Sequence, residues 1–180
     1  MRVERRLSVS SLVEPTAPQA ATAPRYQRID HIAFAVHDLE AAIEFFGNVV
    51  GFELIRRLET RGKRTGMISA EMECNGIKFV LCQGTEPESQ VSKLIEHFGP
   101  GVAHVALAVD DVDEAVAELK ESGLKFDTSV ITGPGLKQAF SSRDHNSGLA
   151  FEFINRSGEE GFLSQNVQDL FDQLESSGSY

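Results

Sequence analysis

The chain of 180 residues has no tryptophan and only two cysteines, Cys74 and Cys82. Two thiols are too few for the disulfide framework of a small secreted domain, and no secretory signal is recognisable, so we predict reduced cysteines and a cytoplasmic location. Basic residues are also scarce, since 17 Lys and Arg face 27 Asp and Glu. This balance argues against nucleic acids and anionic membranes as partners. No apolar run approaches the roughly 20 residues that span a bilayer.

The composition divides the chain into a tail, a folded region and a final helix. Residues 1–25 are rich in Ala, Ser, Thr and Pro, which favours a disordered tail over a targeting segment. Residues 26–163 are expected to form a single domain. Residues 164–180 contain a helix from about Ser164 to Ser176, whose apolar positions are spaced to face the domain, so the helix is a candidate lid.

An internal repeat is the strongest structural signal in the sequence. A shift of 73 positions places His31 on His104 and Asp38 on Asp111 without a gap. Each copy reads as a strand, a break that contains an aspartate, and a helix, and Asp38 in the first copy is suited to cap the helix that follows it. We therefore predict an α+β fold of two β-α-β-β-β modules. The modules are expected at about 26–98 and 99–163.

Apolar periodicity and turn residues predict the individual elements. The expected strands are residues 29–36, 52–59, 67–74, 77–82, 103–109, 125–131, 136–141 and 149–154. The expected helices are residues 39–46, 90–98 and 112–121, and Gly47 and Gly51 are expected to end the first of them. The pair Asn75-Gly76 predicts a two-residue hairpin turn between the third and fourth strands.

One carboxylate interrupts the short apolar strand Phe151-Glu152-Phe153-Ile154. A buried carboxylate without a partner is costly. Glu152 is therefore paired with a cation, protonated, bound to a metal, or exposed as the outward residue of an alternating strand. The strand by itself leaves these alternatives open.

Two histidines at equivalent points of the repeat favour the metal. Modules that curl their sheets around one cavity would bring His31 and His104 face to face, with Glu152 beside them. Two imidazoles and one carboxylate with open positions form the facial triad that suits non-haem Fe(II). The same 73-residue shift places Glu152 on Phe79, next to Lys78, so we expect no fourth ligand from the first module. This disfavours a four-ligand site of the glyoxalase I type.

The doubled unit resembles the vicinal oxygen chelate superfamily, and its details resemble the C-terminal, catalytic half of 4-hydroxyphenylpyruvate dioxygenases. The resemblance covers roughly Arg28 to Glu175. Its motifs are Ile29-Asp30-His31, Thr65-Gly66-Met67-Ile68-Ser69, Val102-Ala103-His104-Val105-Ala106 and the run from Phe151 to Phe162. It implies Fe(II) held by His31, His104 and Glu152, and dioxygen chemistry on a small 2-oxo acid, with an aromatic acid as one option.

The same resemblance implies a substrate pocket lined by Ser69, Gln138, Phe162 and Asn166. A plain structural role stays open for these side chains, because Ser69 also suits an ordinary strand hydroxyl and Phe162 a core position. The segment from Phe126 to Lys137 is far shorter than its counterpart in the dioxygenases, which contributes to the pocket around the aromatic ring. The metal chemistry is therefore better supported than any particular substrate.

Our hypothesis from the sequence is an Fe(II)-dependent dioxygenase or hydroxylase that takes a 2-oxo acid and O2. A lone domain of this type leaves sheet surface exposed, which predicts a homodimer. One alternative is a metal-dependent isomerase or lyase, which needs a second carboxylate as general base; Lys78 and Phe79 do not supply it. The other is a non-catalytic small-molecule binding protein of the resistance type, a class that commonly lacks a metal triad.

Overall fold

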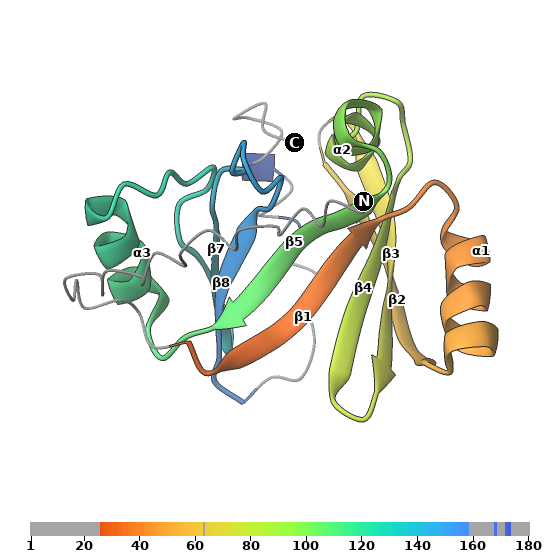
Figure 1. Ribbon diagram of the computed structural model, residues 1–180, viewed down its shortest axis with the longest axis horizontal. Coiled ribbons are helices and arrows are strands. Elements are labelled where there is room, and N and C mark those ends of the chain that lie inside the picture. The colour runs from red at the N-terminus through yellow and green to blue at the C-terminus, as the bar shows by residue number, and fades with distance from the viewer. Residues whose placement is uncertain (1–25, 63, 159–167, 169–171, 174–180) are drawn as a thin grey trace, which may run out of the picture.

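One curled, mixed sheet of eight strands organises the computed structural model, which describes residues 26–62, 64–158, 168 and 172–173 (Figure 1). The strands are β1 Arg28–Ala35, β2 Glu53–Arg61, β3 Gly66–Cys74, β4 Ile77–Gly84, β5 Gly101–Ala108, β6 Ile131–Gly133, β7 Leu136–Phe140 and β8 Phe151–Arg156. The helices are α1 Leu39–Glu44, the π-helix η1 Phe45–Val50, α2 Gln90–Phe98 and α3 Val112–Glu121. Their order in the sheet is β2-β3-β4-β1-β5-β8-β7-β6.

The repeat in the sequence is a repeat in the structure. Strands β1 and β5 lie antiparallel at the centre of the sheet. Each is followed by a helix and three strands, the last of which returns parallel to the first: β4 beside β1, and β8 beside β5. The predicted α+β fold of two β-α-β-β-β units is therefore confirmed, with β1 equivalent to β5 and β4 equivalent to β8.

Each half of the sheet is covered by its own helix on the outer face (Figure 1). Helix α1 packs on β3 and β4, where Leu39, Met72 and Leu81 are buried. Helix α3 packs on β7 and β8, where Val112, Val116 and Phe153 are buried. Since both apolar stripes face outward to a helix, the opposite face of the sheet is left to line an inner cavity.

The two aspartates related by the repeat cap equivalent helices, which confirms the cap predicted at Asp38. Asp38 Oδ1 accepts a hydrogen bond from Ala41 N at 3.0 Å, and Asp111 Oδ1 accepts from Asp113 N at 2.8 Å and Glu114 N at 3.1 Å. These bonds satisfy backbone N–H groups that have no partner within the helix.

We expect Asp111→Ala to lower the free energy of unfolding by about 1 kcal/mol, because α3 loses both cap bonds. Urea denaturation followed by circular dichroism measures this change. Asp111→Asn retains a capping oxygen and serves as the control, with an expected loss of a few tenths of a kcal/mol. Equal losses in the two variants would show that the carboxylate charge, and not the cap, carries the effect.

Most predicted elements match the observed ones, but two differ. The first helix does not end near Gly47: the chain continues as the π-helix η1 to Val50 and stops at Gly51, where φ is 89°. The expected strand at 125–131 is wrong. Only β6, from Ile131, and an isolated bridge between Phe126 and Ser141 pair there.

A hydrogen bond from the backbone to a side chain replaces the ladder of the expected strand. Thr128 Oγ1 accepts a hydrogen bond from Phe140 N at 2.9 Å, in place of a carbonyl of a regular strand ladder.

The hairpin turn is as predicted, with positive φ at both Asn75 and Gly76. Both cysteines are free. No helix in the described part of the chain is long and apolar enough to cross a membrane.

Several sequence predictions lie outside the described residues. They concern the tail at 1–25, the side chains of Phe162 and Asn166, and most of the helix expected from Ser164 to Ser176.

Candidate metal centre

The sheet register brings His31, His104 and Glu152 together from three neighbouring strands. His31 of β1 pairs with Ala106 of β5, and Ala106 in turn pairs with Glu152 of β8. Residues that are directly paired point to the same face of a sheet, so His31 and Glu152 lie in one row. His104 comes two residues before Ala106 and therefore shares that face.

The three side chains converge to short distances. The Nε2 atoms of His31 and His104 each lie 3.2 Å from Glu152 Oε2, and they lie 3.4 Å from each other. One ligand atom from each residue falls within 4.8 Å of the others. Glu152 is fully buried and His31 is 2% exposed. Burial excludes the alternative in which Glu152 is the solvent-facing residue of an alternating strand.

The buried carboxylate is poorly satisfied by the protein alone. Oε2 of Glu152 contacts the two imidazole nitrogens, but Oε1 is buried and has no hydrogen-bond partner among the described residues. Burial by itself would raise the pKa of Glu152, but the charge of His31 and the contacts with both imidazoles lower it to about 2. An ionised, buried carboxylate facing two imidazole nitrogens is a donor set that fits a divalent cation.

The two imidazoles differ in their electrostatic environment. Burial lowers the pKa of His31, but the charges and hydrogen bonds of Glu152 and Asp30 raise it, with a net rise to about 9. Burial lowers the pKa of His104, and the weaker influence of Glu152 does not reverse this. Metal-free protein therefore holds a proton on His31 that a bound metal would displace.

Asp30 and Arg156 orient His31, and the sequence analysis assigned neither of them a role. Asp30 Oδ1 lies 3.1 Å from His31 Nδ1, which places the Nδ1 proton toward the carboxylate and leaves Nε2 for the centre. Arg156 Nε lies 3.2 Å from both oxygens of Asp30. Burial acts to raise the pKa of Asp30, but hydrogen bonds with His31 and Arg156 hold it well below its usual range.

The register corrects the expected counterpart of Glu152. Ala33 pairs with Val80 in the first module as Ala106 pairs with Glu152 in the second, so Val80 and not Phe79 is the equivalent residue. Phe79 packs on the outer face against α1. Valine is no ligand either, and the strand supplies no fourth one at this position.

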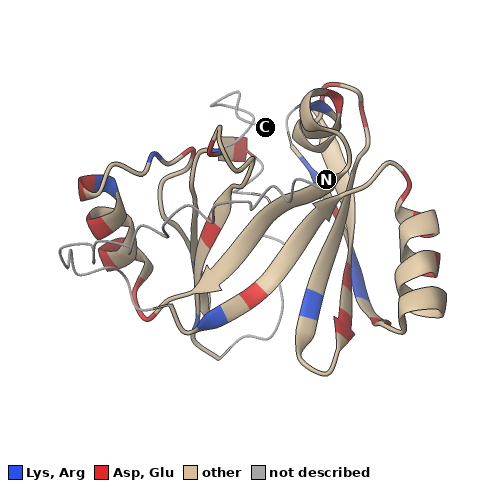
Figure 2. Ribbon diagram, viewed as in Figure 1, with Lys and Arg blue, Asp and Glu red and all other residues tan. Residues whose placement is uncertain are grey.

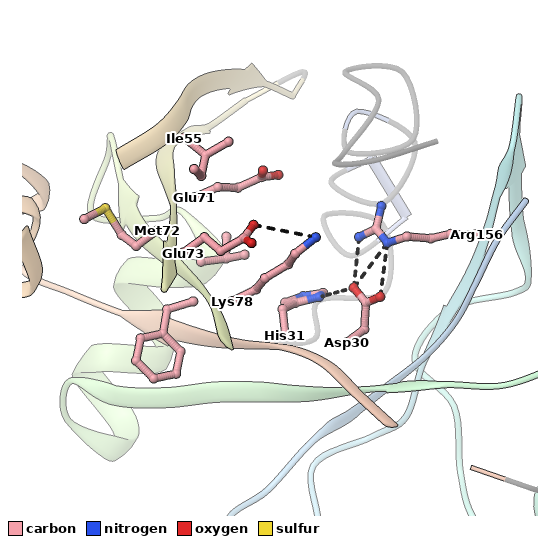
Figure 3. Close-up of a pocket in the computed structure, with 10 residues that line it drawn as sticks. Asp30, His31, Ile55, Glu71, Met72, Glu73, Lys78 and Arg156 are labelled. Atoms are coloured by element: carbon pink, nitrogen blue, oxygen red, sulfur yellow. Dashed lines mark hydrogen bonds and ion pairs between the residues drawn. The ribbon is translucent and has the colours of Figure 1, made fainter. Parts of the chain in front are cut away.

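A cavity beside His31 is lined by charged residues of the first module (Figure 3). The lining residues are Asp30, His31, Ile55, Glu71, Met72, Glu73, Lys78, Phe79, Val80 and Arg156. Figure 2 shows charges of both signs on β1, a basic band on β4 and acidic bands on β3. Glu71 and Glu73 come from β3, so the first module does bring carboxylates to the cavity, contrary to the expectation from β4 alone. Alternation along β3 assigns both carboxylates to one face of the strand, but it does not indicate that this face lies beside His31.

Two of the expected substrate residues lie on the cavity side of the sheet. Ser69 pairs with Cys82 on β4, and Gln138 pairs with Ile154 on β8, two residues from Glu152. Both Ser69 and Gln138 are buried. They occupy equivalent places in the two modules, and neither is among the residues that line the cavity beside His31. Phe140, also on β7, packs edge-on against the ring of His104 at 5.2 Å.

Comparison with known protein families identifies the superfamily of the chain. Residues 28–153 match the model of the Glyoxalase/Bleomycin resistance protein/Dioxygenase superfamily. The chain belongs to this superfamily. The match spans both modules and all three residues of the candidate centre, so it agrees with the vicinal oxygen chelate fold expected from the sequence.

Individual relatives of this superfamily member differ in their chemistry. A 4-hydroxyphenylpyruvate dioxygenase of Pseudomonas aeruginosa is 29% identical over 82% of the chain and 51% of its own length, so the chain spans about half of that relative. A 4-hydroxymandelate synthase mutant of Streptomyces coelicolor shares the fold, with a TM-score of 0.76 at 21% identity over 94% of this chain and 58% of its own. A methylmalonyl-CoA epimerase of the same organism, bound to 2-nitronate-propionyl-CoA, has a TM-score of 0.64 at 27% identity, covering 74% of this chain and all of its own.

Proposed function

We propose that this chain is a non-haem Fe(II)-dependent oxygenase that acts on a small 2-oxo acid with O2. One observation carries the proposal: Oε2 of the fully buried Glu152 faces two imidazole nitrogens at 3.2 Å, while its Oε1 has no hydrogen-bond partner among the described residues. His31, His104 and Glu152 would hold the metal. Dioxygenase relatives of the superfamily support iron over other divalent cations.

The side chains of the protein have distinct tasks in this proposal. Three protein ligands leave coordination positions open, and Fe(II) bound there supplies a site at which a 2-oxo acid and O2 meet. Asp30 holds the ring of His31 in the orientation and tautomer that a ligand needs. Ser69 and Gln138 contribute a hydroxyl and an amide from the inner face of the sheet, where they would orient the substrate's polar groups.

A second candidate function is favoured by Glu71 and Glu73. A metal-dependent isomerase or epimerase needs a general base near its substrate, and these carboxylates of β3 line the cavity beside His31. The epimerase among the structural neighbours adds support for this reading. Its distinguishing feature is proton exchange at the carbon next to the carbonyl, without consumption of O2.

Turnover measurements separate the two candidates. Protein loaded with Fe(II) is mixed with a panel of 2-oxo acids, and O2 uptake and CO2 release are followed together. The oxygenase proposal expects uptake of O2 matched by release of CO2 with at least one acid. Exchange of the substrate proton in D2O without O2 uptake would instead establish the isomerase. Protein that takes up no metal would leave only a binding function.

Metal binding near pH 7 is expected to release close to one proton per site and to weaken as pH falls. The proton is the one on His31, whose pKa is raised to about 9, so the metal and the proton compete for Nε2. Affinity therefore rises with pH until about 9 and then levels off. Calorimetric titration in buffers of different ionisation enthalpy counts the protons. An affinity that is flat from pH 6 to 9 would contradict this competition.

We also propose that the chain forms a homodimer. Large apolar side chains are exposed on η1, as at Val49, and on the sheet, as at Ile77, and a second copy of the chain would cover them. Gel filtration with light scattering is expected to give about twice the 19.7 kDa mass of one chain. A mass of one chain over the micromolar range would refute the dimer.

A further inference from the structure

Each of the two candidate histidine ligands follows a β-bulge. In the pairing of β1 with β5, Asp30 is an extra residue on β1 directly before His31, and Ala103 is an extra residue on β5 directly before His104. The 73-residue shift of the repeat relates the two bulges. Bulges next to active sites re-aim a side chain. The directions in which His31 and His104 point therefore depend on how firmly these two bulges are held.

The two bulges offer different groups to their histidines. In the first, Asp30 Oδ1 lies 3.1 Å from His31 Nδ1, and Figure 3 shows the carboxylate beside the ring. In the second, Ala103 has only a methyl group at the equivalent position. Among the described residues, the carboxylate of Glu152 is the only one that pairs with His104. The second bulge therefore lacks the side chain that orients the ring in the first.

The guanidinium of Arg143 binds the backbone of the second bulge. Arg143 lies in the loop between β7 and β8, and its Nη2 donates a hydrogen bond to Ala103 O at 2.6 Å. The pairing of β5 with β8 begins only at Val105 and Phe151, so this carbonyl lies before the start of the ladder. A backbone carbonyl needs a donor when it is removed from water. Arg143 supplies the donor that a longer β8 would have given.

Arg143 also connects the bulge to two other segments. Its Nη1 donates to Gly148 O in the same loop, and its guanidinium carbon lies 5.3 Å from the ring centroid of Phe98 at the end of α2. Its Nε is buried without a hydrogen-bond partner in the described part of the chain. Burial of part of a cation is costly. The contacts with Ala103, Gly148 and Phe98 offset this cost and hold the guanidinium in one place.

From these contacts we infer that Arg143 is a positioning residue of the candidate metal centre. It fixes the bulge at Ala103 and thereby holds the ring of His104 toward the other two ligands. Phe140 packs edge-on against the same ring, but it leaves the backbone of the bulge unsupported. The two modules thus orient their histidines by different means, a carboxylate on the ring of His31 and a guanidinium on the backbone before His104. This inference rests on the proposed metal centre.

A double-mutant cycle tests whether Arg143 acts through His104. Equilibrium dialysis of the full chain with Co(II), used as an air-stable substitute for Fe(II), gives the Kd of each variant. Arg143→Met should bind Co(II) about 10–100-fold more weakly than the wild type, as is typical when a residue that supports a ligand is removed. In the background of His104→Ala, the same substitution should weaken binding by less than about 2-fold, because the ligand that it positions is gone. A merely structural role would give equal losses in the two backgrounds.

Two further variants complete the test. Arg57→Met, an exposed residue of β2 that pairs with Glu40, should bind Co(II) as the wild type does. Arg143→Lys keeps the charge and one donor, so a smaller loss of about 3–10-fold is expected. This loss should also vanish without His104, which decides the matter if Arg143→Met does not fold.

The outcomes separate the inference from the proposed function. Co(II) affinity of Arg143→Met within about 2-fold of the wild type, or equal losses with and without His104, would overturn the inference and leave the metal centre intact. Wild-type protein that binds neither Co(II) nor Fe(II) would refute the metal centre, and the inference would fall with it.

Discussion

Glu152→Gln protein is expected to bind Fe(II) more than about 100-fold more weakly than the wild type and to lose 2-oxo acid-dependent O2 uptake. Substitutions of residues that only support a ligand cost 10–100-fold in metal affinity, so the loss of a ligand charge should exceed this range. The amide has nearly the same shape as the carboxylate, so the site keeps its packing while it loses the one negative charge among the three donors. Anaerobic equilibrium dialysis with Fe(II) measures the affinity.

A matched control for this experiment is Glu121→Gln, at the exposed end of α3. It removes the same charge far from the centre and should bind Fe(II) as the wild type does. Circular dichroism should show the same folded spectrum for both variants. Fe(II) affinity of Glu152→Gln within a few-fold of the wild type would mean that the carboxylate is not a ligand.

The second large effect is expected for Asp30→Ala. Asp30 is 6% exposed and is bound by the guanidinium of Arg156, whose side chain is 13% exposed. Removal of one partner from a buried ion pair destabilises a protein by about 3–5 kcal/mol, because the remaining charge keeps its desolvation cost. His31 also loses the acceptor that orients its ring, so metal affinity should fall about 10–100-fold. Urea denaturation and Fe(II) titration measure the two losses separately.

A double substitution separates the role of the ion pair from that of the orienting contact. Asp30→Asn with Arg156→Gln removes both charges and should recover most of the lost stability. It should not recover the metal affinity, because a neutral amide beside His31 Nδ1 does not raise the basicity of the ring as a carboxylate does. Recovery of both quantities would show that Asp30 acts on the fold alone.

The sequence predicts the fold because its signals are local or repeated. The helix cap at Asp38 and the Asn75-Gly76 turn depend on residues next to one another, and the structure shows both as expected. The 73-residue repeat supplied the one long-range relation, the equivalence of His31 and His104. That relation was enough to predict that these two histidines lie face to face, and their Nε2 atoms are 3.4 Å apart. The pairing of β1 with β5 at the centre of one sheet was not predicted.

What the sequence did not predict depends on contacts between distant segments. Asp30 and Arg156 are 126 positions apart, and no local pattern connects them. The cavity wall was missed because alternation assigns Glu71 and Glu73 to one face of β3 but does not say that this face closes over His31. The one-residue error at Phe79 has a similar cause, since the loops of the two modules differ in length and the shift of 73 becomes 72 at the last strand.

The central claim is that His31, His104 and Glu152 hold Fe(II) with positions left open for a 2-oxo acid. Anaerobic titration of the purified protein with Fe(II), followed by a panel of 2-oxo acids, tests it most directly through the visible charge-transfer band of a chelated oxo acid. We predict one Fe(II) per chain and a band with at least one acid, both lost in Glu152→Gln. Protein that binds no Fe(II), or that binds Fe(II) equally well without the Glu152 carboxylate, would contradict the claim.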